Sequence, residues 1–249
     1  MSNKLQNKTA IVTGGGTGIG LATAKRFAGE GARVFITGRR KDVLDAAVAE
    51  IGSNAEAVLA DSANLEDLDR LYNTVRERAG SLDIVVANSG SGALAPLGEI
   101  TEEHVDQTLG TNVKGVIFTV QKALPLLSDK ASIILIASTT STRITGPGQS
   151  IYAASKAAVR NLARGWALDL AGRGVRVNAI SPGPTKTPGL LEGFPGSEEQ
   201  VLAFMAQGVP LGRVAEVDEI ASAALFLASD EASYVNGIEF FVDGGQAQV

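Results

Sequence analysis

The feature that most constrains the fold is a glycine-rich segment, residues 14–20, which directly follows the short β-branched run Thr9–Thr13. An amphipathic stretch near 18–29 comes next, so the order is strand, tight turn and helix. Glycines let the backbone turn sharply and approach a ligand, and a helix amino end stabilises negative charge. This order predicts a βα unit that binds a pyrophosphate, whereas the glycine spacing alone would be a weak signal.

Short apolar runs alternate with longer amphipathic stretches along the whole chain, which predicts parallel βαβ units. Near-continuous apolar strands fit a sheet covered on both faces. We expect an α/β fold with a doubly wound, mostly parallel seven-stranded sheet, helices on both faces and ligands at the carboxyl ends of the strands. Strands are expected at 9–13, 33–37, 56–60, 84–87, 132–137, 175–180 and 238–242, and helices near 18–29, 41–51, 65–79, 102–127, 151–171 and 216–228.

One segment rich in proline and glycine, residues 182–212, interrupts this alternation. A loop of that length in a compact domain is typically a functional lid or disordered. Ser197 and Gln200 have the spacing of a capping box, which predicts a short helix over 198–207. We therefore expect one domain over residues 1–249 with a substrate lid at about 184–212, the alternative being an inert excursion.

Composition narrows the possible functions. The 249 residues carry a net charge of −5 and no long basic run, which argues against a nucleic-acid partner. No apolar run approaches the roughly 20 residues of a membrane span, and the polar amino terminus does not resemble a signal peptide, so a cytoplasmic protein is expected. The absence of cysteine and the single His104, expected on the surface of a helix capped by Thr101, argue against a metal site and against a Ser-His-Asp triad.

The second expected strand ends in Gly38-Arg39-Arg40, with no acidic residue. An acid at this place would accept a hydrogen bond from the ribose 2′-hydroxyl of NAD. Two guanidiniums can instead pair with a 2′-phosphate through charge-assisted hydrogen bonds. The sequence therefore predicts NADP(H), with NAD(H) as the weaker alternative and Arg39 as the firmer of the two contacts.

Tyr152 and Lys156 lie four residues apart in a predicted helix, which places both side chains on one face. A free tyrosine has a pKa of about 10, and a nearby positive charge lowers it. The spacing therefore predicts a tyrosine tuned to act as a general acid and base near neutral pH.

These motifs resemble the classical short-chain dehydrogenase/reductase family over essentially the whole chain. Residues 13–20 match its TGxxxGIG pattern, Asp61 its adenine contact, and residues 83–90 its NNAG segment, with Ala87 and Ser89 as departures. Asn112 matches the asparagine of the catalytic tetrad, and Tyr152 with Lys156 the YxxxK pair. Residues 181–187 match the PGxxxT segment and residues 242–245 the carboxyl-terminal signature.

The resemblance implies hydride transfer between NADP(H) and a carbonyl or alcohol, with Ser138, Tyr152, Lys156 and Asn112 as catalytic residues. Spacing would also allow Thr139, and more weakly Ser141, as the catalytic hydroxyl. It further implies a homotetramer. Predicted cofactor contacts are Gly14, Gly16, Thr17, Gly18, Ile19, Gly20, Arg39, Arg40, Asp61, Ser62, Asn88, Gly90, Tyr152, Lys156, Pro182, Gly183, Thr185 and Thr187, and predicted substrate contacts are Ser138, Gln149, Tyr152, Leu190 and Phe194.

Other functions stay open at this point. The runner-up is a reductase of 3-oxoacyl thioesters, and a non-catalytic nucleotide-binding sensor is a further alternative. A dehalogenase-like relative would replace the lysine with arginine and lose the glycine-rich loop, but Lys156 and residues 14–20 are both present.

Overall fold

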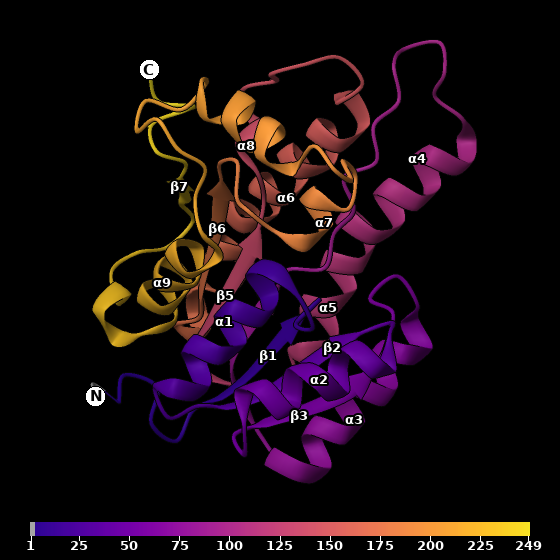
Figure 1. Ribbon diagram of the computed structural model, residues 1–249. Helices are drawn as coiled ribbons and strands as arrows, with labels where there is room; N and C mark the ends of the chain where they lie inside the picture. The colour runs from indigo at the N-terminus through magenta and orange to yellow at the C-terminus, as the bar shows by residue number, and fades with distance from the viewer. Residues whose placement is uncertain (1–2) are drawn as a thin grey trace.

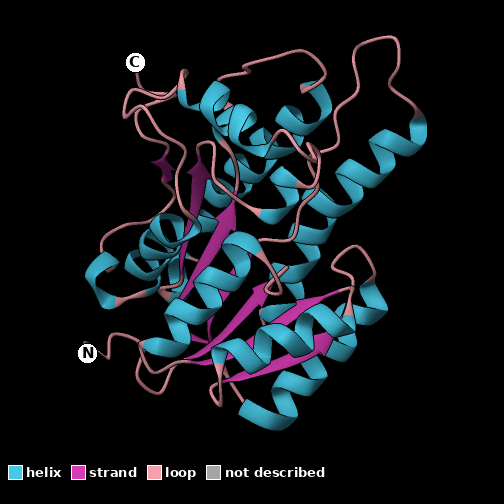
Figure 2. Ribbon diagram, viewed as in Figure 1, coloured by secondary structure: helices cyan, strands magenta, loops and turns pink. Residues whose placement is uncertain are grey.

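Seven strands form one parallel sheet in the order β3-β2-β1-β4-β5-β6-β7 (Figures 1 and 2). The computed structural model describes residues 3–249. The chain moves outward from β1 to β3 and then crosses back to β4, so the order reverses between β1 and β4. This confirms the doubly wound fold and places its switch point beside the glycine-rich turn. The strands are β1 Thr9–Thr13, β2 Arg33–Gly38, β3 Ala55–Leu59, β4 Leu82–Ala87, β5 Leu127–Ile136, β6 Arg176–Pro182 and β7 Glu239–Val242.

Helices cover both faces of the sheet (Figure 2). On one face α1 packs with α2 and α9, and on the other α3 packs with α5, while α6 lies against β6 and β5. Two further short helices, α7 and α8, lie beyond the carboxyl ends of β5 and β6 (Figure 1). The helices are α1 Gly18–Gly29, α2 Lys41–Ile51, α3 Leu65–Ala79, α4 Glu102–Leu109, α5 Gly115–Ala123, α6 Ser150–Asp169, α7 Pro188–Leu191, α8 Glu198–Ala206 and α9 Val217–Ala228.

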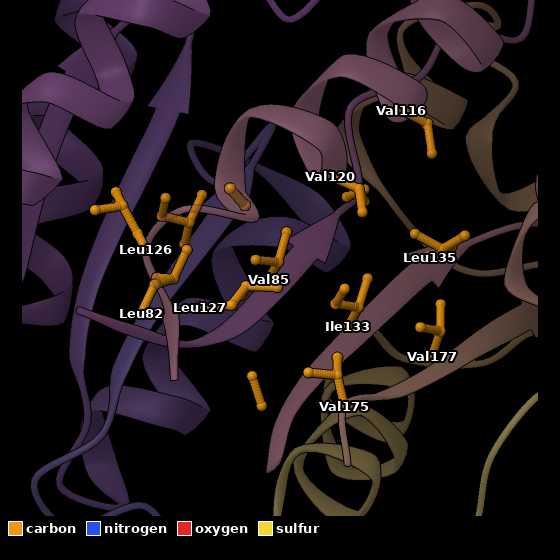
Figure 3. Close-up of a cluster of buried hydrophobic side chains, with 14 of the residues drawn as sticks. Leu82, Val85, Val116, Val120, Leu126, Leu127, Ile133, Leu135, Val175 and Val177 are labelled. Atoms are coloured by element: carbon orange, nitrogen blue, oxygen red, sulfur yellow. The ribbon is translucent and has the colours of Figure 1, made fainter. Parts of the chain in front are cut away.

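Two apolar clusters sandwich the sheet, and strand β5 contributes to both. Ile133 and Leu135 belong to the cluster shown in Figure 3, and Ile134 and Ile136 belong to the cluster on the opposite face. Successive side chains of a strand point to opposite faces, so a strand buried on both sides is apolar at every position. The continuous apolar runs of the sequence are explained in this way.

The helix expected over 102–127 is interrupted. It divides into α4, one π-helical turn at Gly110–Lys114, and α5, which ends at Ala123. The π turn contains Asn112, whose side chain is bonded to neighbouring elements, and it is bounded by glycine, a poor helix former. Strand β5 also begins earlier than expected, because Leu127 already pairs with Leu82. An irregularity in the register follows before Ser132 pairs with Ile84, and Lys130 within it has a left-handed φ of 64°.

The cap predicted at Ser197 and the surface position predicted for His104 both differ from the structure. Ser197 does not cap α8 with its side chain, and the capping box lies instead at Glu216 and Glu219 on α9. Thr101 caps α4 as expected, accepting a hydrogen bond from the His104 amide at 3.1 Å. The His104 side chain, however, is partly buried, and its Nε2 has no hydrogen-bond partner among the described residues.

Neither a membrane span nor a metal cluster occurs in the part of the chain that the structure describes. Within residues 3–249, no helix is both long and apolar enough to cross a membrane. The same residues include no group of three or more His, Cys, Asp or Glu side chains that could hold a metal ion.

Candidate active site

The glycine-rich turn between β1 and α1 is packed too tightly for side chains. A Cβ atom at Gly20 would lie 2.1 Å from the Gly14 carbonyl oxygen, and Gly18 has a positive φ of 55° that L side chains rarely adopt. Asn88, which follows β4, donates from Nδ2 to the carbonyl oxygens of Thr13 and Gly14 at 2.9 and 3.2 Å. Asn88 therefore fixes the turn against the neighbouring strand.

The amino end of α1 opens into a cleft. Thr17 is its N-cap residue but makes no side-chain cap, and no acidic residue lies in the first turn. The first amides of a helix have no partner within the helix, and the helix dipole adds partial positive charge there. These amides are therefore available to a phosphate group, so the chain's own residues fit the pyrophosphate of a dinucleotide.

The cleft follows the carboxyl ends of the strands and has a volume of about 1490 Å³. All the residues that the sequence predicted for cofactor binding line it. They are Gly14, Gly16, Thr17, Gly18, Ile19, Gly20, Arg39, Arg40, Asp61, Ser62, Asn88, Gly90, Tyr152, Lys156, Pro182, Gly183, Thr185 and Thr187.

Arg39 and Arg40 lie at one end of this cleft, directly after β2. Both side chains are exposed, and neither forms a hydrogen bond or ion pair with another described residue. Asp61, on the same side, is already engaged because its Oδ1 accepts from the Ala63 amide at 2.9 Å. The two guanidiniums are thus free to bind an anionic ligand.

At the other end, Ser138 and Tyr152 come together from β5 and α6. Ser138 follows β5 and forms a hydrogen bond with the Tyr152 side chain. Thr139 points elsewhere and donates to Gln246 Oε1 at 3.2 Å, and Ser141 donates to Glu239 Oε1 at 2.7 Å. Of the three hydroxyls that the sequence left open, Ser138 is the one that contacts Tyr152.

Lys156 lies one helical turn beyond Tyr152 and is buried. Its Nζ donates to the Ile136 carbonyl oxygen at 2.9 Å and lies 5.8 Å from the centre of the Tyr152 ring. Burial lowers the pKa of Lys156 to about 8, because an ammonium loses hydration there.

The expected lowering of the Tyr152 pKa is not what the structure shows. Burial raises the pKa of Tyr152, and the hydrogen bond from Ser138 opposes that rise. The reason is that a phenolate is poorly solvated in this site, while the Lys156 ammonium is directed at a backbone carbonyl. The Ser138 hydroxyl is thus the group that favours the phenolate.

The buried Lys156 gives the protein a specific dependence of stability on pH. Its pKa is about 8 in the folded state and about 10.5 in the unfolded chain, so the unfolded state binds more protons between these values. The contribution of Lys156 to stability therefore rises with pH through this window. We expect Lys156→Met to raise the free energy of unfolding at pH 7, by on the order of 1 to 2 kcal/mol. Urea titrations at pH 7 and pH 10 should show this gain shrinking, and a pH-independent difference would contradict the assignment.

Asn112 occupies the π turn between α4 and α5 and is fully buried. Its Nδ2 donates to the Ser91 carbonyl and to Ser155 Oγ at 2.9 and 3.0 Å, and its Oδ1 accepts from the Ser91 amide at 2.8 Å. A Cβ atom at Gly90 would lie 3.2 Å from Lys156 Nζ and 3.3 Å from Asn112 Oδ1. The two polar groups therefore flank the small space above Gly90.

The substrate end of the cleft differs in part from expectation. Gln149 and Leu190 line it, but Phe194 does not and is 43% exposed in the segment after α7. Phe204 on α8 lines the cleft instead. The cleft is also lined by Gln246, which the sequence did not predict. Phe204 was within reach of sequence reasoning because it lies on the predicted short helix, whereas Gln246 is brought in by tertiary contacts.

The fold and the site define a class of protein: a Rossmann-type oxidoreductase with its ligand cleft at the carboxyl ends of a parallel sheet. A family model described as "Enoyl-(Acyl carrier protein) reductase" matches residues 14–247. The chain belongs to the short-chain dehydrogenase/reductase family, as the sequence motifs predicted.

Several characterised or solved relatives align over nearly the whole chain. "Oxidoreductase asL5" of Sarocladium schorii is 49% identical over 99% of this chain and 98% of its own. The 3-oxoacyl-[acyl-carrier-protein] reductase FabG of Thermotoga maritima is 37% identical, covering 97% and 98%. The NADP-dependent (R)-specific alcohol dehydrogenase of Lentilactobacillus kefiri is also 37% identical, covering 98% of each chain. A short-chain dehydrogenase of Burkholderia cenocepacia, solved in complex with NADP, superposes with a TM-score of 0.90 at 35% identity, covering 98% and 99%.

Proposed function

We propose that this oxidoreductase interconverts a ketone or aldehyde and the corresponding alcohol with NADP(H). The observation that carries the proposal is that Ser138, Tyr152 and Lys156 open into the same cleft as the glycine-rich turn and Arg39. The bound dinucleotide would supply the hydride. The glycine-rich turn and the amino end of α1 would hold its pyrophosphate, Arg39 and Arg40 its 2′-phosphate, and Lys156 its ribose hydroxyls.

The chain's own residues would supply the proton and hold the reacting oxygen. In reduction, Tyr152 donates its phenolic proton to the substrate oxygen, while the Ser138 hydroxyl donates a hydrogen bond to that oxygen. In oxidation, Tyr152 takes the proton back from the alcohol. Asn112 holds the π turn beside Lys156, and water between them would complete a path for the proton to solvent.

The test of this function follows the absorbance of NADPH with a panel of aliphatic and aromatic ketones, aldehydes and diketones. A 3-oxoacyl thioester belongs in the panel because a relative at 37% identity is a reductase of that substrate class. An enoyl thioester belongs there because of the description of the matching family model. Oxidation of NADPH by simple ketones or aldehydes supports the proposal, whereas turnover of only one thioester would replace it with that reaction. Tight NADPH binding without any turnover would favour the nucleotide-binding sensor.

Arg39 is expected to set the preference for NADP(H). Arg39→Ala should weaken NADPH binding by about 10- to 100-fold, since it removes a hydrogen-bonded charge pair, and should change NADH binding by less than about twofold. Dissociation constants from the quenching of protein fluorescence would measure both. The neighbouring Arg40→Ala is the matched control and should have the smaller effect. Equal losses for the two cofactors would show that Arg39 does not contact the 2′-phosphate.

The assembly and the location of the protein are also proposals. A homotetramer joined through α4, α5 and α6 would cover Leu168, which is 80% exposed on α6. A cytoplasmic location stays a prediction from the sequence.

A further inference from the structure

The turn that carries Ser138 is fastened to the carboxyl-terminal segment of the chain. Thr139 Oγ1 donates to Gln246 Oε1 at 3.2 Å, and Ser141 Oγ donates to Glu239 Oε1 at 2.7 Å. Arg143 donates from Nη1 to the backbone carbonyls of Gln246 and Val249. These contacts join residues that lie about a hundred positions apart in the chain. Among the described residues, Ser138 itself makes only local hydrogen bonds besides the one to Tyr152, so its placement depends on these anchors.

Glu239, the first residue of β7, is the centre of this arrangement. Its carboxylate is only 6% exposed, and its Oε1 accepts from two hydroxyls, Ser141 of the turn and Ser181 of β6, each at 2.7 Å. Its Oε2 lies 3.3 Å from Nη1 of Arg160 on α6. One buried carboxylate thus joins the turn, the sheet and the helix.

Ser138 and Tyr152 lie on two different elements, and Glu239 contacts both of these elements. Ser138 begins the turn that contains Ser141, and Tyr152 lies two helical turns before Arg160 on α6. Among the described residues, the Arg160 guanidinium has its ion pair with this carboxylate, and its buried Nε has no partner there. A buried ion pair rarely stabilises a protein more than apolar residues of the same size would, so net stability is a poor explanation for this one.

We propose that Glu239 is a positioning residue that holds the Ser138 hydroxyl against Tyr152 by fixing the Ser138 turn to helix α6. This inference rests on the proposed role of Tyr152 as acid and base. Glu239 is not one of the residues that line the cleft, and it acts through its contacts with Ser141 and Arg160.

The sharpest kinetic test removes the hydrogen bond between Ser141 and Glu239 and no other contact of Glu239. Ser141→Ala leaves the pair between Glu239 and Arg160 in place. The matched control Thr142→Ala removes the adjacent hydroxyl, whose one hydrogen-bond partner among residues 3–249 is Ser141. We expect Ser141→Ala to lower kcat about tenfold with KM and the NADPH dissociation constant unchanged, because misplaced catalytic groups lose rate and not binding. In a Ser138→Ala background the same substitution should have no further effect. Additive losses, or an unchanged kcat, would overturn the proposal.

A second measurement needs no turnover. The amides of Thr142 and Arg143 both donate to the Thr139 carbonyl, at 3.0 and 2.9 Å, so their hydrogen exchange reports on the turn. Exchange in the peptide 138–143 should accelerate about tenfold in Ser141→Ala and in Glu239→Ala, with β5 unchanged, and should stay as in the native protein for Thr142→Ala. If the native protein reduces no carbonyl in the panel, the proposed function fails, and exchange still decides whether Glu239 holds the turn. Native exchange in both variants would refute the anchor.

Discussion

Replacing Tyr152 with phenylalanine is expected to lower kcat for carbonyl reduction by about 10²- to 10⁴-fold, the range that a positioned general acid contributes. The variant loses one hydroxyl, the donor that would protonate the substrate oxygen. The ring stays, so its place beside Lys156 is kept. The NADPH dissociation constant should therefore change by no more than about threefold, because only one hydrogen bond in the cofactor site is at risk.

The chain offers a matched control for this substitution. Tyr234 is fully exposed and lies in the segment before β7, so Tyr234→Phe removes the same atom from the surface. Steady-state kinetics of both variants, with urea titrations to compare their stabilities, would separate chemistry from folding. A Tyr152→Phe variant that keeps more than about a tenth of the native kcat would show that another group supplies the proton.

Much of the fold could be predicted because its determinants are local. The bounds of β1, α1, α2 and α3 are those expected from apolar periodicity and from the glycine-rich turn. The break at Asn112 could not be predicted in this way. It depends on hydrogen bonds from Asn112 to Ser91 and Ser155, residues brought near only by the finished fold.

The same distinction holds for the site. The placement of Tyr152 and Lys156 on one face of α6 follows from helical spacing, and the structure places both in the cleft. The sign of the Tyr152 pKa shift could not be predicted from the spacing of Lys156, because the shift depends on burial of the phenol in the finished fold. Glu239 and Gln246 were missed as well, since their partners Ser141 and Thr139 lie 98 and 107 positions earlier in the chain.

Gly20→Ala is expected to destabilise the protein by about 3 kcal/mol and to weaken NADPH binding at least tenfold. A Cβ atom there would lie 2.1 Å from the Gly14 carbonyl oxygen and 2.6 Å from Asn88 Nδ2. Neither atom can move away without a large cost in free energy. The Gly14 carbonyl is backbone with a positive φ, and Asn88 Nδ2 is bonded to that same carbonyl. The turn must therefore move away from α1, which takes the helix amides out of reach of a pyrophosphate.

Gly29 at the end of the same helix provides the comparison. It is exposed, and a Cβ atom there would meet nothing within 4 Å. Gly29→Ala should be neutral or should stabilise by up to about 1 kcal/mol, because alanine restricts the unfolded chain and favours the helix. Urea unfolding and NADPH titration of the two variants would measure the difference. Equal stability and equal NADPH affinity for both would mean that the close approach of α1 to the turn is not what shapes the pyrophosphate site.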